Sequence, residues 1–371
     1  MKIRKIKIIK QIYTISNSGN ITHYYHFFFA VLIPFINLYL KEMDDNYIYD
    51  FKFNLGQMVS ILKYIFPNKI INNYDTSYKT SCIYDNYNLY CNLNNLNDNS
   101  LLPAYDIFEN FIYLYIDQKN KINSNQIVNL TKRLENKQAN YNRKVLLYTH
   151  LNNDIINNRL KINSFFNSLV HLKRKYRKII LIEREQPKKF ISDIFTSTGG
   201  ERRFIYNHKE LNDKLTEIYG LDFENIICDN LNIVEQYNIF KNASVIIAQH
   251  GAAISNIYFC NTKKNVNLIE ITPSWNKNNN AFKNLANSCS INYSCIKQSH
   301  MTKSECTFFF DNIIIKDNYI KKRVYDNINL FFNNKISINK DNWENLAEIS
   351  LIINCGSINI KNTLKKIKEI L

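Results

Sequence analysis

The chain has 371 residues, of which 45% are hydrophobic and 13% aromatic, so it can bury large cores, and its length suggests about two domains. Its 48 Lys and Arg against 32 Asp and Glu give a formal net charge of +16, which favours phosphates, nucleic acid or an acidic membrane surface as partners but does not indicate a fold. The 8 cysteines include no Cys-x-x-Cys pair and no zinc-ligand spacing, which argues against a cysteine metal site and favours a reducing compartment.

The first 40 residues combine a basic start with an apolar stretch, which imitates a membrane anchor. The apolar stretch at 27–40 is interrupted by Pro34 and Asn37, and it is shorter than the roughly 20 residues that a helix needs to span a bilayer. Alternating isoleucines predict a strand at 3–12, and the apolar pattern predicts a buried helix at 24–41. No membrane span is expected, and an anchor is the second interpretation.

The remainder of the first part, up to residue 172, mixes apolar segments with long Asn-rich loops. Helices are expected at 55–66 and 125–138. A basic run at 173–178 then leads into an apolar segment that begins at Ile179. We interpret the run as a solvated helix end or linker, with a nucleic-acid contact as the alternative.

From residue 179 onward, apolar strands alternate with helices. Asn207 and Asn232 each stand three residues before a glutamate, which predicts a capping box at two helix starts, and Gly220 is expected to close the first helix. The alternation predicts a parallel, doubly wound sheet with right-handed crossovers. Strands are expected at 179–183, 225–228, 244–248 and 266–271, and helices at 208–219, 233–242, 252–260 and 280–288.

The C-terminal region carries fewer signals. Its pattern predicts a strand at 307–315 and a helix at 318–332. A Lys-rich amphipathic helix is expected at 361–371, and it either packs on a domain or binds an acidic partner.

The most informative junction is His250-Gly251, which follows an apolar strand and precedes a helix in a chain with only 7 glycines. Such a turn offers backbone N–H groups and a helix dipole to an anion. In doubly wound sheets ligands gather at the carboxyl ends of the strands, where Arg184 and Glu270 also lie, while Arg203 precedes a helix. Arginines suit a diphosphate and a carboxylate suits ribose or sugar hydroxyls, so this edge predicts a nucleotide-sugar site.

These residues belong to a longer series of motifs, whose pieces are Arg184 after the strand, Arg203-x-Ile205-x-Asn207-x-x-Glu210-Leu211, Glu235-Gln236 with Phe240 and Ala243, His250-Gly251-Ala252 through Asn256, and Glu270-Ile271-x-Pro273. With this order and spacing, residues 179–273 resemble the catalytic domain of the glycosyltransferase 61 family. That family includes protein O-linked N-acetylglucosaminyltransferases and plant xylosyl- and arabinosyltransferases. A weaker resemblance at 20–34, to the family's Asn-Tyr-His-aromatic helix start, corresponds to His26.

The resemblance implies an α/β fold of GT-B type with two Rossmann-like, doubly wound domains. Residues 1–172 would be the acceptor-side domain, 173–325 the nucleotide-sugar-binding domain, and 326–371 a C-terminal extension of unknown role. It further implies inverting, metal-independent transfer of a sugar from a UDP-sugar to a hydroxyl of a protein or glycan acceptor. No metal and no cofactor are expected, and the chain contains no Asp-x-Asp, the motif that holds the cation in metal-dependent glycosyltransferases.

The resemblance also assigns the donor site, although the residues themselves allow structural roles. A salt bridge is the alternative for Arg184 and Glu270, a hydrogen bond that holds the turn for His250, and packing against the turn for Asn256. Arg202 is the alternative to Arg203 for the contact with the donor. The donor-site residues are Arg184, Arg203, His250, Gly251, Ala252, Asn256 and Glu270.

Two histidines are candidates for catalysis. An inverting transfer needs a base that takes the proton of the acceptor hydroxyl, and His26 from the first domain is the candidate. His23 and His26 also fit a structural pair or metal ligands. His250 would donate to the diphosphate or to the sugar.

Other functions stay open at this point. Ala253 stands where the family usually has a second glycine and Ser255 where threonine is common, so an inactive transferase fold that serves as a binding module is one alternative. A basic nucleic-acid-binding protein is another, although no specific nucleic acid is expected. A cytoplasmic location is expected, with the lumen of the secretory pathway as the alternative.

Overall fold

In the computed structural model the chain divides into two units, Met1–Leu169 and Val170–Leu371. The sequence places the boundary at 172/173. The predicted helix at 125–138 and Arg202 lie outside the described residues. These are 5–14, 23–42, 47–51, 55–72, 112–114, 143–147, 158–171, 177–184, 203–261, 263–273, 281–312, 318–333 and 355–371.

The first unit contains a parallel sheet built around β1 (Lys5–Thr14), the strand predicted at 3–12. β1 pairs in parallel with β2 (Tyr47–Phe51), β4 (Ile112–Leu114) and β5 (Arg143–Leu147). Its register with β2 begins at Lys5 opposite Tyr47. The strand β3 (Ile70–Ile71) pairs with β2.

The segment predicted as a buried helix at 24–41 is helical and buried, but it contains one π-helical stretch. Phe35 in this segment packs edge-on against Tyr49 and Phe51 of β2, with ring centroids 5.0 Å apart, which holds the helix on the sheet. None of the helices in the described part of the chain is both long and apolar enough to cross a membrane. The helices of this unit are α1 (Tyr24–Phe27), η1 (Phe28–Leu32), α2 (Ile33–Glu42), η2 (Gly56–Met58), α3 (Val59–Ile65) and α8 (Arg159–Ser168).

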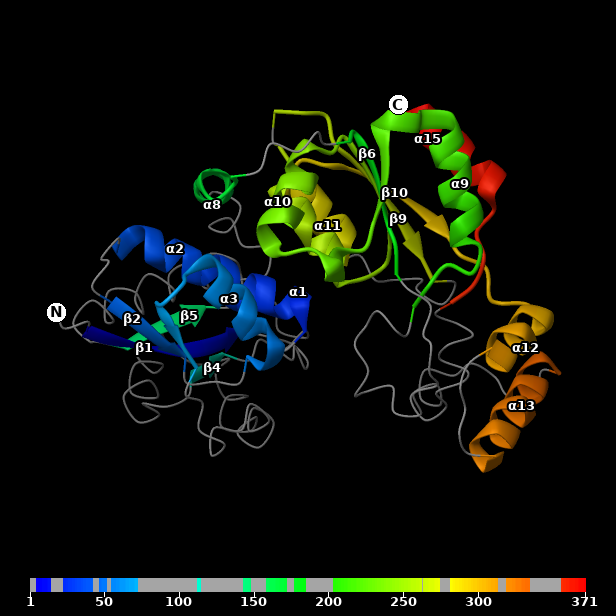
Figure 1. The fold of residues 1–371 in the computed structure, drawn as a ribbon, viewed down its shortest axis with the longest axis horizontal. Coiled ribbons are helices and arrows are strands. Elements are labelled where there is room, and N and C mark those ends of the chain that lie inside the picture. Colours follow the sequence, from blue (N-terminus) through cyan, green and yellow to red (C-terminus); the bar gives the residue numbers. More distant parts are fainter. Residues whose placement is uncertain are drawn as a thin grey trace, which may run out of the picture. The chain divides into compact units, whose positions relative to one another are not determined.

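The second unit contains a five-stranded, all-parallel sheet in the order β10-β9-β8-β6-β7 (Figure 1). The chain moves from β6 outward to β7, and then returns past β6 to β8 and on to β10. The direction of winding therefore reverses between β6 and β8, as expected of a doubly wound sheet. The strands are β6 (Ile179–Ile182), β7 (Phe223–Ile226), β8 (Val245–Gln249), β9 (Asn267–Thr272) and β10 (Asn292–Lys297).

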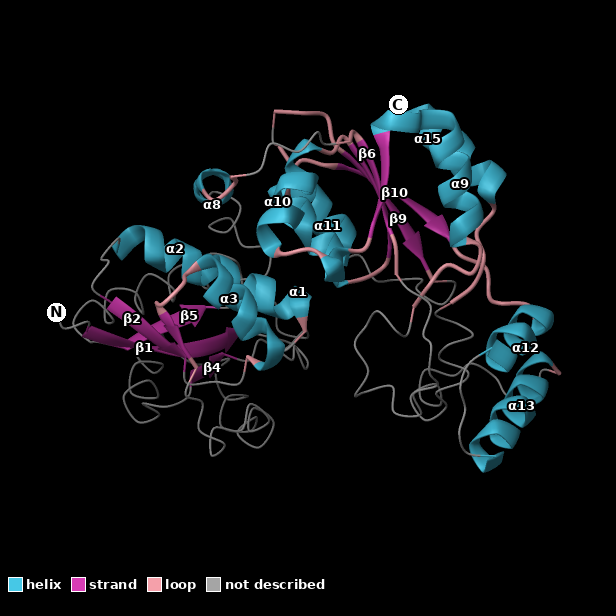
Figure 2. Cartoon of the chain, viewed as in Figure 1, coloured by secondary structure: helices cyan, strands magenta, loops and turns pink. Residues whose placement is uncertain are grey.

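Helices cover both faces of this sheet (Figure 2). On one face, Leu181 and Ile247 of the strands share an apolar core with Leu211 of α9 and Ile367 of α15. On the other face, η7 contacts both α10 and α11. The helices are α9 (His208–Tyr219), α10 (Ile233–Asn242), the 3-10 helix η7 (Ala252–Phe259), α11 (Ala281–Ser288) and α15 (Ile360–Ile370), and two short 3-10 turns lie at η5 (Gly220–Asp222) and η6 (Cys228–Asn230).

The two predicted capping boxes have different outcomes. Asn232 accepts hydrogen bonds from the backbone of Val234 and Glu235, and Glu235 bonds back to the Asn232 N–H, so this box is confirmed. The box predicted at Asn207 is wrong, because its side chain makes no capping bond and instead pairs with the backbone of Ile358. Gly220 ends α9 with a φ of 48°, as predicted.

The strand predicted at 307–315 is also wrong, because residues 303–312 form the helix α12 (Lys303–Asn312). Thr302 and Glu305 cap its start reciprocally. Its aromatic residues Phe309 and Phe310 pack in an apolar cluster with Val324 of α13 (Asn318–Phe332), which is the helix predicted at 318–332. Two of the three consecutive phenylalanines at 308–310 are thus buried on a helix, and the run does not form a strand.

Other differences are small. The helix predicted at 252–260 is the 3-10 helix η7, and β7 begins two residues earlier than the predicted strand. β10 has no counterpart among the predictions. Residues 355–371 of the predicted C-terminal extension belong to the second unit, where α15 packs against α9.

Candidate functional site

The predicted site residues of the second unit lie around the reversal of the sheet order. Arg184 follows β6 and His250-Gly251 follows β8, and β6 and β8 are the neighbouring strands between which the winding reverses. In open α/β sheets this reversal opens a crevice outside the carboxyl ends of the strands, where ligands bind. Glu270 lies in β9, the next strand of the sheet.

Arg184 lies directly against Gly251. A Cβ added at Gly251 would stand 2.5 Å from the guanidinium carbon of Arg184, which is too close for any real side chain. Glycine at this position therefore lets a guanidinium group occupy the space above the turn. Gly251 lies between β8 and η7, so the guanidinium group of Arg184, which follows β6, is positioned at the start of η7.

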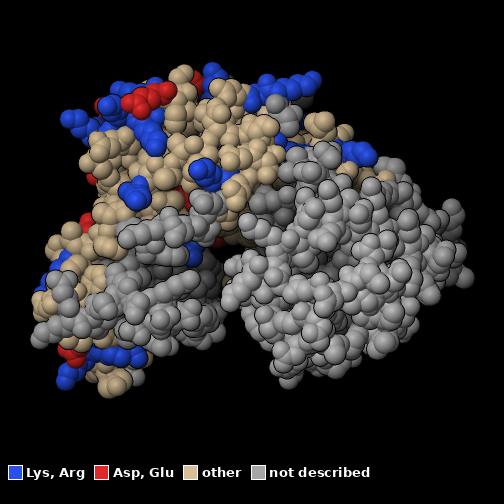
Figure 3. Space-filling model, turned by 180° about the vertical axis from the view of Figure 1, so that it is seen from behind, with Lys and Arg blue, Asp and Glu red and all other residues tan. Residues whose placement is uncertain are grey.

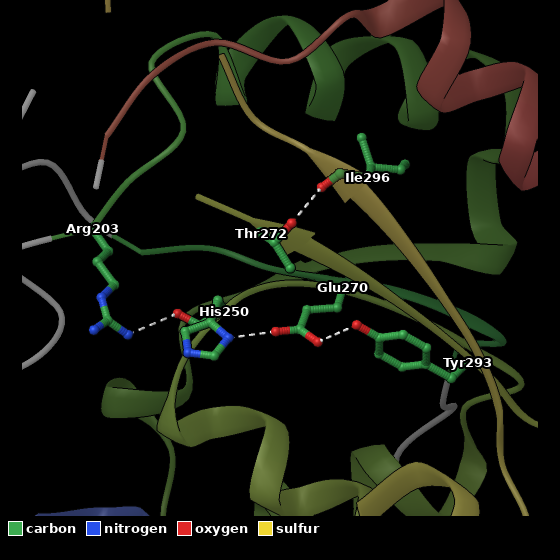
Figure 4. A network of polar contacts seen from close by, with 6 residues as sticks. All are labelled: Arg203, His250, Glu270, Thr272, Tyr293 and Ile296. Carbon is green, nitrogen blue, oxygen red and sulfur yellow. Dashed lines mark hydrogen bonds and ion pairs between the residues drawn. The ribbon is translucent and has the colours of Figure 1, made fainter. Parts of the chain in front are cut away.

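Arg203 also contacts the His250-Gly251 turn. Its Nη1 is 3.5 Å from the His250 carbonyl oxygen, a long hydrogen bond (Figure 4). The following residue, Phe204, is fully buried and anchors the segment in the apolar cluster beneath. The structure therefore brings both predicted arginines to His250.

His250, Glu270 and Tyr293 form a chain of hydrogen bonds (Figure 4). His250 Nδ1 is 2.5 Å from Glu270 Oε1, and the Tyr293 hydroxyl donates to Glu270 Oε2 at 2.7 Å. Glu270 is 0% exposed and His250 is 5% exposed. The Phe282 ring of α11 packs edge-on against the imidazole with ring centroids 5.0 Å apart. A carboxylate only accepts hydrogen bonds, so it fixes the proton of the imidazole on Nδ1.

Electrostatics favour the neutral imidazole. Burial lowers the pKa of His250 below its usual value, the hydrogen bond to Glu270 opposes this change, and the positive charges of Arg203 and Arg184 lower the pKa further. With the proton on Nδ1, the lone pair is on Nε2, which lies on the side of the ring away from Glu270 (Figure 4). Burial, and then the contact with Glu270, raise the pKa of Tyr293, so its hydroxyl stays protonated.

The helix after the turn presents its start to the same edge. η7 begins at Ala252, and both Ala252 and Ala253 are half-buried. Asn256, by contrast, is 0% exposed, and its side chain donates to Gln236 at 2.7 Å. Gln236 in turn donates to the carbonyls of Cys228 and Leu231. This bond of Asn256 ties η7 to α10.

Sequence reasoning missed Tyr293 and Phe282 as members of the site. Tyr293 lies on β10, whose residues are exposed or half-buried without a regular alternation, so its pattern gave no strand signal. Phe282 lies on a helix that was predicted without a role in the site. The structure places His26 in α1 and does not describe its side chain.

A second histidine–carboxylate cluster lies near the first. His208 Nε2, at the start of α9, is 3.1 Å from Asn225 Oδ1 and 3.5 Å from Glu183 Oε2, and Asn225 donates to the same carboxylate. Burial lowers the pKa of His208, while Glu183 and Asn225 oppose this change. The cluster joins α9 to the ends of β6 and β7.

On the face shown in Figure 3, Lys and Arg side chains occur in several separate places, with Asp and Glu among them. Within the described ranges, no group of three or more His, Cys, Asp or Glu side chains could hold a metal ion.

Comparison with known proteins gives a family for the chain. A family model described as Glycosyltransferase 61 matches residues 24–267, more than half of the chain, and this range includes Arg184, Arg203 and the His250-Gly251 junction. A search of curated proteins found no match.

Proposed function

The chain belongs to the glycosyltransferase 61 family, and from this premise we propose that it transfers GlcNAc, xylose or arabinose from a UDP-sugar to a hydroxyl of a protein or glycan, with inversion. As a glycosyltransferase it uses a nucleotide-sugar donor and an acceptor. The UDP group, the sugars, the inversion and a GT-B arrangement of the two units are proposals. The observation that carries the UDP group is the pair of arginines at His250-Gly251, where the sheet order reverses.

The two arginines and the start of η7 suit the diphosphate of the donor. The Arg184 guanidinium group lies against Gly251, and Arg203 Nη1 is 3.5 Å from the His250 carbonyl oxygen, so both charges lie at the same turn. Guanidinium groups bind phosphate through paired hydrogen bonds, and a helix start adds backbone N–H groups. These groups would stabilise the negative charge that develops on UDP as it leaves.

His250 is proposed as a hydrogen-bond acceptor and not as a donor to the diphosphate. Donation from Nε2 would need a second proton, which burial and the neighbouring Arg184 and Arg203 disfavour. A neutral imidazole with its lone pair on Nε2 accepts a hydrogen bond from a hydroxyl group. Glu270 would hold the ring in this tautomer.

His26 remains the proposed general base. Inverting transfer needs a group that takes the acceptor's hydroxyl proton on the face opposite the leaving phosphate. The family match begins at Tyr24 and includes His26 in α1. A His26→Gln variant that retains UDP binding and loses transfer would support this role, and undiminished transfer would contradict it.

Metal-independent transfer is also proposed, since the guanidinium groups and the helix start supply positive charge at the leaving group. UDP release at an unchanged rate after treatment with EDTA is the expected result. Loss of activity that Mg²⁺ or Mn²⁺ restores would overturn this part. A reducing, cytoplasmic environment is also proposed, because cysteines such as Cys228 and Cys306 are buried in the manner of small apolar residues.

The test is donor binding followed by turnover. UDP, but not GDP, is expected to raise the melting temperature of the protein. Labelled UDP-GlcNAc, UDP-xylose and UDP-arabinose are then compared by UDP release. Arg184→Ala and Arg203→Ala should each weaken UDP binding by about tenfold to a hundredfold, because each removes a charged hydrogen-bond donor.

Arg177→Ala is the matched control. Arg177 lies just before β6, at the opposite end of the strand from Arg184, and is also half-buried. Its variant should bind UDP like the wild type. A wild-type protein whose melting temperature no nucleotide raises, or equal losses in all three variants, would contradict the proposed donor site.

A further inference from the structure

Arg203 begins a segment, residues 203–207, that precedes α9 and is held by residues far along the chain. Ile205 pairs with Gly356 in an isolated parallel bridge, and the Tyr206 N–H donates to the Gly356 carbonyl at 2.8 Å. Asn207 makes two further bonds, both 2.9 Å long, one to the carbonyl and one from the N–H of Ile358. The C-terminal segment thus runs beside residues 203–207 like an added strand.

Gln298 joins this pair of segments to the sheet. Its side chain is 2% exposed, and Nε2 donates to the carbonyl oxygens of Phe204 and Gly356, both at 3.0 Å. Its Oε1 accepts from Gln249 Nε2 at 2.9 Å, and its backbone N–H bonds to the Thr272 carbonyl of β9. Both amide hydrogens and the amide oxygen are therefore used.

The residues that this amide contacts are neighbours of the donor-site residues. Phe204 directly follows Arg203, and Gln249 directly precedes His250. Gln298 therefore connects the Phe204 backbone with the Gln249 side chain, and these two residues adjoin the partners in the contact between Arg203 and the His250 carbonyl. A shift of residues 203–207 would move the guanidinium group away from the turn.

Gly356 lets the C-terminal segment come this close. A Cβ at this position would overlap the carbonyl oxygen of Ser299, a backbone atom that cannot turn aside. The Ser299 N–H also donates to the Ser357 carbonyl at 2.9 Å, so the segments are in backbone contact on this side as well. The three-way junction at Gln298 leaves no room for a side chain at position 356.

We propose that Gln298, together with residues 355–358, positions Arg203 for the phosphates of the donor. Gln298 and Asn207 are positioning residues in this arrangement: they act through Arg203 and do not touch the donor. The inference rests on the proposed function, since it takes UDP as the ligand of Arg203. A buried amide is costly unless all its hydrogen bonds are made, and here its bonds hold the segment that carries the arginine.

The test is a double-mutant cycle on UDP binding, measured by calorimetry up to millimolar UDP. Gln298→Met keeps the side-chain length and removes all three amide bonds. It should raise the Kd for UDP by about tenfold in the wild-type background and by less than about twofold in the Arg203→Ala background. Asn207→Ala should show the same coupling with a smaller effect. In turnover, the donor KM should rise more than kcat falls.

Gln236→Met is the matched control. Gln236 is also a buried amide that donates to two backbone carbonyls and accepts from another amide, but it has no contact with residues 203–207 among its described bonds. Gln236→Met should lower the melting temperature. It should change the Kd for UDP by the same factor in the wild-type background and in the Arg203→Ala background. This separates a loss of overall stability from a loss of positioning.

The outcomes are distinct. A wild-type protein that does not bind UDP overturns the proposed function. UDP binding that Arg203→Ala weakens, with an effect of Gln298→Met that is equally large in both backgrounds, overturns only the positioning role. If Gln298→Met does not fold, the coupling of Asn207→Ala to Arg203→Ala decides the question.

Discussion

Two histidine–carboxylate clusters lie at the same end of the second sheet, and they differ in what surrounds them. In one, Glu270 is fully buried between His250 and Tyr293, and two arginines lie close to the imidazole. In the other, the side chain of Glu183 is 29% exposed and contacts His208 and an asparagine. The first cluster has the two arginines at the turn after β8, whereas the second joins α9 to the ends of β6 and β7. We therefore expect ligand binding at the first cluster and a packing role for the second.

The largest expected effect separates the two histidines. His250→Ala should lower kcat by roughly a hundredfold, because it removes the proposed acceptor of a hydroxyl hydrogen bond and takes away the imidazole partner of the buried Glu270. His208→Ala should lower the melting temperature and change kcat by less than about threefold. UDP release and thermal unfolding of both variants give the comparison. Similar losses of kcat in the two would remove the functional distinction between the clusters.

Replacement of the two carboxylates should give a smaller contrast. In Glu270→Gln an amide faces His250 Nδ1 and no longer fixes the proton there, so kcat should fall by roughly tenfold to a hundredfold. Glu183→Gln keeps a polar partner for His208 and should leave kcat within about twofold. Steady-state rates measure both. A Glu270→Gln enzyme as fast as the wild type would show that the tautomer of His250 is unimportant.

A weaker effect is expected at the far end of the first cluster. Tyr293→Phe removes only the hydroxyl, which leaves Glu270 Oε2 without this bond and should lower kcat by about threefold and the melting temperature slightly. Tyr219→Phe, on α9, is the control, and it should leave the rate unchanged. A loss as large as that of Glu270→Gln would mean that Tyr293 itself meets the substrate.

The smallest expected effect is a change in the free energy of unfolding with pH. Burial lowers the pKa of His250 and of His208 in the folded chain below the usual value of 6.5. Between the lowered and the usual value the unfolded chain binds more protons, so the free energy of unfolding decreases as the pH falls below about 6.5. Thermal unfolding from pH 7.5 to 5 should show this decrease. His208→Gln should make it shallower, and an unchanged slope would assign the effect to other groups.

The sequence predicts local structure well where the signal is local. Asn232 and Asn207 have the same spacing to a glutamate, yet only Asn232 caps its helix. The difference comes from Ile358, which lies 151 residues beyond Asn207 and offers two backbone groups to its side chain. Tertiary hydrogen bonds of this kind cannot be inferred from spacing.

The sequence predicted the candidate site residues that lie at the ends of clear strands, and it missed those on elements with a weak pattern. Arg184, His250 and Glu270 each lie on or just after a predicted strand, and parallel strands bring their carboxyl ends together. Tyr293 could not be found, because β10 is an edge strand with exposed and half-buried residues and no apolar alternation. The reciprocal cap of Thr302 and Glu305 was present in the sequence as a helix signal, and the aromatic run that follows it masked that signal.

The packing of Arg184 on Gly251 links the choices open to evolution at two positions 67 residues apart. A larger residue at 251 requires the Arg184 guanidinium group to turn aside or the side chain at 184 to be shortened, and either change takes the charge away from the turn. In a library that randomises both positions and selects for folding alone, the two positions should therefore vary almost independently, because a flexible side chain at 184 can move away. Selection for sugar transfer should leave almost only the glycine–arginine pair.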